Sequence, residues 1–293
     1  MPPIPRNRRA NASKFKRFFA AASSIRKAFA TLTMQAEIIL LGSGTSMGVP
    51  TLGCECGVCR STDSRDRRTR PSIAVAFHAE EQDRCVLIDS GPDFRQQALR
   101  ESLRSIDAVL YTHAHADHIL GLDDLRPLTF GRPAKVPLYA DQATAEVLER
   151  MFEYTFSEAN KYPHKARVCL QPLLARTSLF GVDFLSVPLI HGEMQTTGFR
   201  FGNAAYLTDM SDIPESSFAL LQDLDVVILD ALRKTPHPGH SHLERSLQFV
   251  ERMRPRMAYF THMSHELGHV ETEQSLPSNV RLTYDGLRIP CQL

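Results

Sequence analysis

Three histidines and an aspartate lie within six consecutive positions, a density of ligand-type side chains that points to a metal site. His113, His115, Asp117 and His118 follow the apolar segment 108–111, which predicts a buried strand. At the end of a strand these side chains can converge on one point. Because buried imidazoles without partners are costly, a shared metal ion is the expected explanation. Imidazole and carboxylate ligands together suit zinc, manganese or iron.

Three more residues of ligand type follow apolar segments that predict strands. His191 follows 187–190, Asp209 follows 205–208, and His262 follows 257–261. Singly, each could be a surface residue or the N-cap of a helix. Together with the four clustered residues, they complete a ligand set for two metal ions.

A second cluster contains only cysteines. Cys54, Cys56 and Cys59 provide three soft, anionic ligands within six positions, a spacing suited to a structural zinc ion. A redox role, or simply reduced thiols, is the alternative. A tetrahedral site needs a fourth ligand. The remaining cysteines could supply it, although each resembles a single buried or edge thiol: Cys85, Cys169 and Cys291.

An α/β scaffold is expected to position these residues. The chain has 43% apolar and 23% charged residues, which excludes collagen-like, wholly disordered and disulfide-scaffold proteins. No apolar run approaches the roughly 18 residues of a membrane span, so no membrane association is expected. Predicted strands occupy 37–41, 72–77, 84–89, 108–112, 182–187, 199–201, 205–208, 226–229 and 257–261, and predicted helices occupy 94–103, 142–154 and 243–252. This interleaving predicts one α/β domain whose sheets are covered by helices.

The first 36 residues differ from the rest in charge. They contain eight Lys or Arg and no acid, which leaves a net charge of −7 on the remainder. We expect residues 1–34 to be a disordered or cleaved basic extension and residues 35–293 to be the functional domain. An Arg-rich, acid-poor start is typical of a mitochondrial transit peptide. The alternatives are a basic tail, or an upstream start codon with Met34 as the true beginning. The predicted location is therefore cytoplasmic, or mitochondrial if the transit peptide is real.

The His-x-His-x-Asp-His motif after a buried strand resembles the signature of the metallo-β-lactamase superfamily. Segments 87–94, 121–126 and 206–213 resemble one branch of it, the PhnP-like phosphodiesterases, which include the cyclic-phosphate phosphodiesterase of bacterial phosphonate breakdown. The resemblance covers about residues 35–285. It implies an αββα sandwich with a dinuclear metal site at one edge of the paired sheets.

The resemblance also implies how the ligands are shared. Two divalent ions, zinc or manganese, would be held by His113, His115 and His191 for one and by Asp117, His118 and His262 for the other, with Asp209 bridging them. The lactamases themselves commonly hold Cys at the bridging position, so Asp favours other hydrolase branches. The fourth ligand of the structural zinc would be His265.

A general acid is expected in the loop that contains His237, His240 and His242. The resemblance assigns this role to His240, with His242 as the local competitor; a loop imidazole near the metals could protonate a leaving alkoxide. The predicted catalytic residues are thus His240 and the ligand Asp117.

Other polar residues could support the reaction. Arginines at positions 67, 68, 70 and 126 could clamp an anionic substrate, or they could simply be solvated. Asp89 and Asp230 end apolar strands; they could orient ligand imidazoles or sit in turns.

These features predict an enzyme, a dinuclear metal-dependent hydrolase that cleaves small cyclic or activated phosphodiesters by attack of a metal-bridging hydroxide. One alternative is a tRNA 3′-processing endoribonuclease, although the net charge of −7 does not favour nucleic acid as a partner. Another is a glyoxalase II-type thioester hydrolase, which should carry a Gly pair where 119–124 reads ILGLDD. A non-enzymatic metal-binding protein is disfavoured because no ligand is missing. A homodimer is implied only by analogy.

Overall fold

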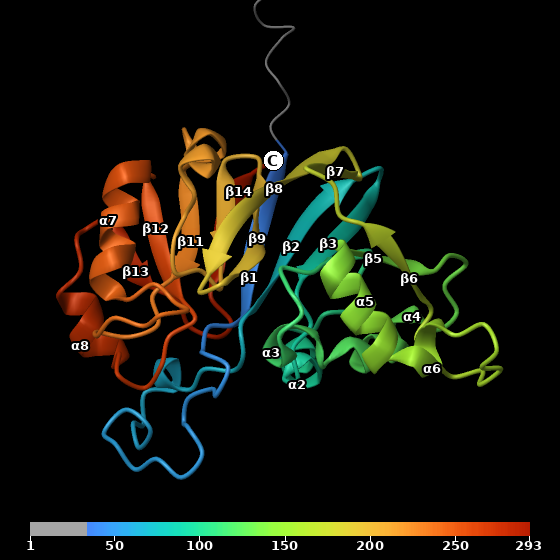
Figure 1. Ribbon diagram of the computed structural model, residues 1–293, viewed down its shortest axis with the longest axis horizontal. Coiled ribbons are helices and arrows are strands. Elements are labelled where there is room, and N and C mark those ends of the chain that lie inside the picture. Colours follow the sequence, from blue (N-terminus) through green and yellow to red (C-terminus); the bar gives the residue numbers. More distant parts are fainter. Residues whose placement is uncertain (1–33) are drawn as a thin grey trace, which may run out of the picture. The chain divides into compact units, whose positions relative to one another are not determined.

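Residues 34–293 are described by the computed structural model, so the predicted basic extension lies outside the described residues except for Met34. The described part forms two sheets of seven strands each (Figure 1). The first has the order β14 (Arg288–Gln292), β1 (Gln35–Gly42), β2 (Ser72–Ala79), β3 (Gln82–Ile88), β4 (Ala108–Leu110), β5 (Val136–Ala140), β6 (Val168–Pro172). The second has the order β13 (Val280–Leu282), β12 (Met257–Thr261), β11 (Val226–Asp230), β10 (Ala204–Leu207), β9 (Met194–Phe201), β8 (Val182–His191), β7 (Arg176–Leu179).

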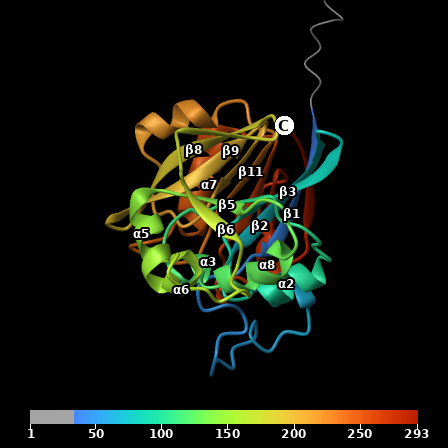
Figure 2. The same ribbon diagram turned by 90° about the vertical axis from the view of Figure 1, so that its right-hand side faces the viewer.

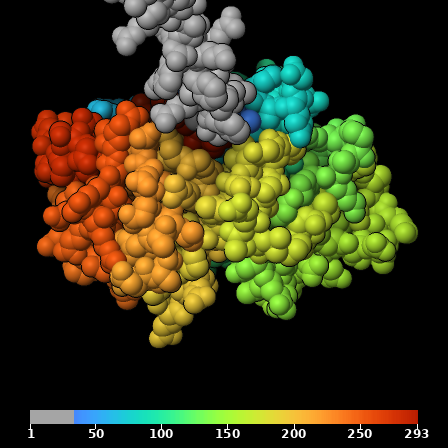
Figure 3. Space-filling model, turned by 90° about the horizontal axis from the view of Figure 1, so that it is seen from above, coloured from blue at the N-terminus to red at the C-terminus, as the bar shows by residue number. Residues whose placement is uncertain are grey.

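The two sheets pack face to face through a central apolar layer. Ile38 and Val75 of the first sheet share one buried cluster with Phe184 and Tyr206 of the second. Burying apolar surface of this kind stabilises by roughly 25 cal/mol per Å² removed from water. Seen from above, the segment that contains β7 to β9 fills the middle of the visible face (Figure 3).

Helices cover the outer faces of both sheets (Figures 1 and 2). Their bounds are α2 (Phe94–Arg100), α3 (Ala116–Ile119), α4 (Arg126–Thr129), α5 (Gln142–Met151), α6 (Glu153–Phe156), α7 (Leu243–Met253) and α8 (His269–Gln274). Leu148 of α5 joins the outer cluster of the first sheet, and Phe249 of α7 joins that of the second. The predicted αββα sandwich is therefore confirmed. None of these helices is long and apolar enough to cross a membrane, within the part of the chain described.

Two features depart from the predicted elements. The helix expected over 142–154 is broken at Phe152, whose φ of −115° and ψ of 38° end α5 and let its side chain enter the core. Strands β5, β6, β7, β13 and β14 were not predicted. Two of them, β13 and β7, border the second sheet, and the other border strands, β14 and β6, contain Pro290 and Pro172. Short edge strands with polar or proline residues carry little apolar signal.

The strands that precede the predicted ligands point the same way. Strands β3 and β4 are parallel, as are β10, β11 and β12, so their carboxyl ends meet at one edge of the sandwich. The other end holds Met34, which pairs with Leu293 through two backbone hydrogen bonds of 3.2 and 2.9 Å. The edge that carries the predicted ligands is thus remote from the start of β1.

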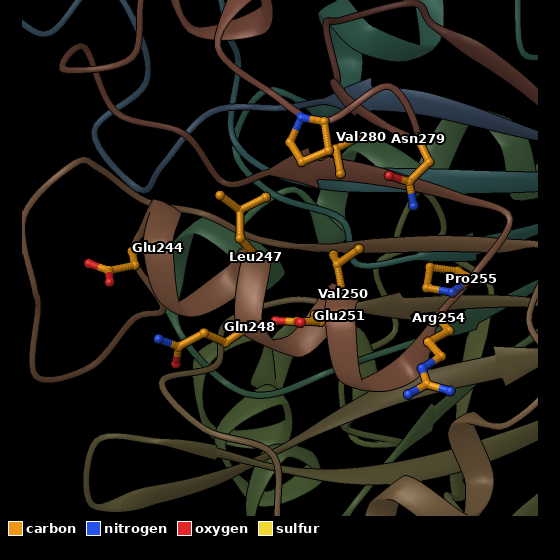
Figure 4. A pocket seen from close by; sticks show the side chains of 10 residues that line it. Glu244, Leu247, Gln248, Val250, Glu251, Arg254, Pro255, Asn279 and Val280 are labelled. Carbon is orange, nitrogen blue, oxygen red and sulfur yellow. The ribbon is translucent and has the colours of Figure 1, made fainter.

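A groove of about 530 Å³ lies between α7 and the segment that leads into β13 (Figure 4). Its walls include Leu247, Gln248, Glu251, Arg254 and Asn279. It contains none of the residues that the described chain gathers into clusters of metal-ligand type. The clusters of ligand-type residues that contain Asp209 lie at the strand ends instead.

A buried arginine ties the cysteine-containing segment to the loop after β12. The Arg68 side chain is 0% exposed; it donates to the carbonyls of Ser264 (3.0 Å) and Leu267 (2.6 Å) and pairs with Asp66 (3.1 Å). Arg68 therefore has a structural role, and it is not available to bind an anionic substrate, which was one of the two alternatives predicted from the sequence.

Replacing Arg68 with alanine should lower the free energy of unfolding by about 3 kcal/mol, because two carbonyls and the carboxylate of Asp66 would lose their buried partner. Circular dichroism during urea unfolding measures this, since the chain has no Trp for fluorescence. The neighbouring Arg67 is exposed, so Arg67→Ala should change stability by about 0.5 kcal/mol or less. Equal losses in the two variants would contradict the assignment.

Candidate metal centre

The predicted ligands sit where strands end and the backbone turns sharply. Asp209 follows β10 with φ of 39°, and His262 follows β12 with φ of 58°. Asp89, directly after β3, also has a positive φ of 64°. Non-glycine residues adopt this left-handed conformation at an energetic cost, and such residues concentrate at functional sites. These residues bring their side chains close together at one edge of the sandwich.

The seven predicted ligands come together as two groups that share Asp209. In each group, one ligand atom from every residue lies within 4.8 Å of all the others. The two groups are His113, His115, His191 and Asp209, and Asp117, His118, Asp209 and His262. This division is the one that the resemblance implied.

The carboxylate of Asp209 lies between the two groups. Its Oδ2 is 3.6 Å from His113 Nε2 and 3.2 Å from His118 Nε2, while its Oδ1 is 3.1 Å from His262 Nε2. Both of its oxygens are therefore directed at imidazole nitrogens. Asp209 is only 2% exposed, so water does not screen these charges.

Buried polar atoms without partners support metal binding at this place. Nε2 of His113, His118 and His262 and Oδ2 of Asp117 are all buried, and none has a hydrogen-bond partner within the described chain. A buried polar atom left without a partner costs about 1–3 kcal/mol. Four such atoms face one another here, and divalent cations between them would satisfy all four. The donor set therefore fits the two metal ions that the fold implies.

Other groups hold the ligand imidazoles in the required orientation. Asp89 Oδ2 accepts from His118 Nδ1 at 2.7 Å, and His191 Nδ1 donates to the Gly239 carbonyl. Asp89 itself accepts from the backbone N–H and the hydroxyl of Thr112, at 2.8 Å each. With Nδ1 carrying the proton, Nε2 of each imidazole is left as the metal ligand.

Charge interactions within the cluster keep its carboxylates ionised. Burial alone would raise the pKa of Asp209, but the imidazoles of His262 and His118 hold it well below its usual range. Burial alone would lower the pKa of His118, but the carboxylates of Asp209, Asp117 and Asp89 raise it well above its usual range. The carboxylates therefore stay anionic at neutral pH, and a metal ion must displace the proton that they favour on His118.

His240 lies beside the cluster and is held by a second outer carboxylate. Its Nδ1 is 2.8 Å from Asp230 Oδ2, and its ring is 4.6 Å from the ring of His262 and 4.5 Å from that of His191, centroid to centroid. Oδ1 of Asp230 lies 3.6 Å from Nδ1 of His262. Asp230 thus reaches both a ligand and the predicted acid. His242, the competitor, is instead the N-cap residue of α7.

The three cysteines and His265 form a separate cluster. Nδ1 of His265 lies 3.1 Å from Cys54 Sγ, 3.6 Å from Cys56 Sγ and 3.5 Å from Cys59 Sγ. The backbone N–H of Cys59 donates to the Cys56 sulfur and lowers the pKa of that thiol to about 6. Three sulfurs and one imidazole nitrogen form a set suited to tetrahedral zinc.

The remaining cysteines and arginines have other surroundings. Burial raises the pKa values of Cys85 and Cys291 to about 12, which makes these thiols poor metal ligands. Arg70 pairs with Asp93 at 3.1 Å, and Arg126 lies 3.5 Å from Asp123. Neither arginine stands as a free cation beside the ligands.

Comparison with known proteins assigns the fold to a family. A family model described as a beta-lactamase superfamily domain matches residues 84–263. The crystal structure entitled "a New Diphosphatase from the PhnP Family" has 49% sequence identity and a TM-score of 0.83, with 89% of this chain and 99% of that chain covered. The fold and the family define a hydrolase of the metallo-β-lactamase fold. Within this superfamily, the chain belongs to the PhnP family.

Two further proteins are similar over most of the chain. An octanoyltransferase of Porphyromonas gingivalis is 37% identical over 253 residues, which is 85% of this chain and 50% of that protein. The chain therefore spans about half the length of this curated relative. Zn²⁺-bound PqqB from Methylobacterium extorquens has a TM-score of 0.67 at 21% identity, with 86% of this chain and 99% of that chain covered. At this identity, the likeness shows the fold alone.

Replacing Asp209 with asparagine should lower the metal content of the purified protein by about two ions per chain. The amide keeps the shape of the side chain but removes the negative charge that both groups share. Elemental analysis of the purified variant measures the loss. Asp183→Asn, at an exposed position of β8, is the control and should keep its metals. Full metal content in the Asp209 variant would contradict a bridging role.

Replacing Cys59 with serine should remove about one metal ion per chain and leave the other two in place, because serine does not supply a thiolate. The same elemental analysis measures the loss. Cys169→Ser should have no effect, since Cys169 lies outside the cluster. A variant that loses all its metals would show instead that the two centres depend on each other.

Proposed function

We propose that this protein is a phosphoric diester hydrolase that uses two divalent metal ions to cleave small cyclic or activated phosphodiesters. The observation that carries the proposal is the carboxylate of Asp209, shared by two groups of ligands, with the Asp230–His240 pair directly beside them. This arrangement offers sites for two cations and a proton donor on one side.

The bound metal ions would supply a Lewis acid at the phosphorus centre and a source of hydroxide at neutral pH. Asp209 holds the two ligand groups in register, because both of its oxygens face imidazole nitrogens. Asp89 and the Gly239 carbonyl fix the orientation of His118 and His191. The protein therefore contributes a rigid cradle in which charge that develops on the phosphoryl oxygens is stabilised without reorganisation.

His240 is suited to protonate the leaving oxygen. Its Nδ1 is held by Asp230, so Nε2 is the nitrogen free to donate a proton to the departing alkoxide. Loss of the proton donor should matter most when the leaving oxygen is strongly basic.

The comparisons support a reaction at phosphorus. The PhnP-family relative at 49% identity is named a diphosphatase. In phosphodiesters and in diphosphates alike, hydrolysis attacks a phosphorus atom and breaks its bond to a leaving-group oxygen. The main rival is an acyl substrate, because the relative from P. gingivalis is named an octanoyltransferase. A tRNA substrate is less favoured, since residues 37–293 carry a net charge of −7.

The direct test compares substrate classes on one preparation. Metal-loaded protein is assayed with bis-p-nitrophenyl phosphate, a nucleoside 2′,3′-cyclic phosphate, a dinucleoside diphosphate and an octanoyl thioester, with zinc and with manganese. Turnover of a phosphorus substrate that exceeds turnover of the thioester supports the proposal. Hydrolysis of the thioester alone by fully loaded protein would overturn it.

Replacing His240 with alanine should lower kcat for a nucleoside 2′,3′-cyclic phosphate about 100-fold or more, but should lower kcat for bis-p-nitrophenyl phosphate much less. The alkoxide leaving group needs a proton, whereas p-nitrophenolate leaves without one. Steady-state kinetics on both substrates measure the difference. His78→Ala is a matched control because His78 is exposed on β2 and pairs only with Asp83. Equal losses on the two substrates would exclude a proton-donor role.

A further inference from the structure

A small pocket lies between the dinuclear ligands and the cysteine cluster. It has a volume of about 210 Å³, and His240 lines it from the metal side. His265, the imidazole that faces the three sulfurs, lines it from the cysteine side, and the turn 45–47 completes the wall. The pocket therefore begins at the proposed proton donor and extends away from the ligands.

Arg233 lines the same pocket and has no acidic partner. Its Nε donates to the Thr235 carbonyl at 3.1 Å, and its Nη2 donates to the Pro236 carbonyl at 2.7 Å. These two bonds hold the guanidinium in place while Nη1 stays without a partner. No carboxylate of the described residues lies within 4.0 Å of it. Residues 1–33 contain no Asp or Glu.

This lack of a partner sets Arg233 apart from its neighbours. The next residue, Lys234, pairs with Glu271 at 3.1 Å on the surface. Arg70 and Arg126, the other arginines considered near the ligands, each face an aspartate. An arginine held in position by carbonyl oxygens, with an open N–H group, is well prepared to bind an anion.

We propose that Arg233 is a specificity-determining residue that recognises a negative charge on the departing group of the substrate. The inference rests on the proposed function, because it takes His240 as the group that protonates the leaving oxygen. Whatever is bonded to that oxygen must extend into the pocket that His240 lines. A carboxylate or phosphate on the departing group would there meet the open side of the guanidinium.

The rest of the pocket makes this recognition selective. His237 lies next to His240, with 5.3 Å between ring centroids, and it also lines the pocket near Arg233. Glu266 also lines the pocket and would repel an anion placed beside its carboxylate. Arg233 is the one arginine or lysine among the lining residues, so a negatively charged group is favoured beside its guanidinium.

The test uses diesters that differ only in the leaving phenol. The three are methyl 4-nitrophenyl phosphate, its analogue with a carboxylate on the nitrophenol ring, and its analogue with a phosphonate there. Wild-type protein should show a kcat/KM about tenfold higher for at least one charged leaving group than for the neutral one. In Arg233→Gln this preference should fall about tenfold, with most of the change in KM. The charged substrate with the higher kcat/KM identifies the anion, carboxylate or phosphonate, that the pocket prefers.

Two variants separate recognition from a structural role. Arg233→Lys keeps the positive charge and should retain part of the preference for charged leaving groups. If Arg233 had only a structural role through its two carbonyl hydrogen bonds, its replacement would lower kcat/KM for all three diesters equally. Lys234→Gln should keep the wild-type ratio. A ratio that is unchanged in Arg233→Gln, or absent from the wild type, would overturn the inference. Failure of the wild type to cleave any of the three diesters would instead count against the proposed function itself.

Discussion

The site depends on one buried charge, the carboxylate of Asp209. It is almost fully removed from water and faces imidazole nitrogens of both ligand groups. A carboxylate in such a place is costly unless cations surround it. Bringing His113, His118 and His262 to within 4 Å of Asp209 therefore costs folding free energy, because it buries polar atoms. Bound metal ions would offset this cost, so the fold and its metal ions are expected to stabilise each other.

The sandwich meets this constraint by placing the ligand side chains at or just after strand ends. Strands β10, β11 and β12 are parallel and apolar along their length, and they deliver Asp209, Asp230 and His262 at one edge. The first sheet contributes Asp89 and the segment that begins at His113 in the same way. The two outer carboxylates, Asp89 and Asp230, have related tasks: one orients a ligand, and the other contacts both a ligand and His240. Strand ends of both sheets thus build the centre and its support.

Much of the site could be predicted from the chain because its signals are local. A ligand-type residue at the end of an apolar strand is visible in sequence, which explains why the seven predicted ligands lie close together in the structure. The grouping and the role of His265 came from the family resemblance, since spacing alone does not show which loops meet. The contacts of individual side chains could not be predicted from the sequence. Asp89 and Asp230 could have been turn residues, and Arg68 could have bound an anionic substrate. Arg68 is buried against carbonyls of a segment nearly 200 residues away, and spacing in the sequence does not reveal such a contact. Arg233 lacks an acidic partner because of the local conformation of its loop, which the sequence does not reveal either.

The pairing of Met34 with Leu293 has a consequence for how such a domain can be reused. Both positions lie at the end of the sandwich where β1 begins and β14 finishes, while the ligands lie where β1 leads into the turn before the cysteine segment. A polypeptide attached at either position would start far from the catalytic edge and would not need to cross it. The architecture is therefore modular: it can be joined in tandem to another catalytic unit without altering the metal centre. The protein from P. gingivalis, half of which matches this chain, carries further sequence beyond the matched part.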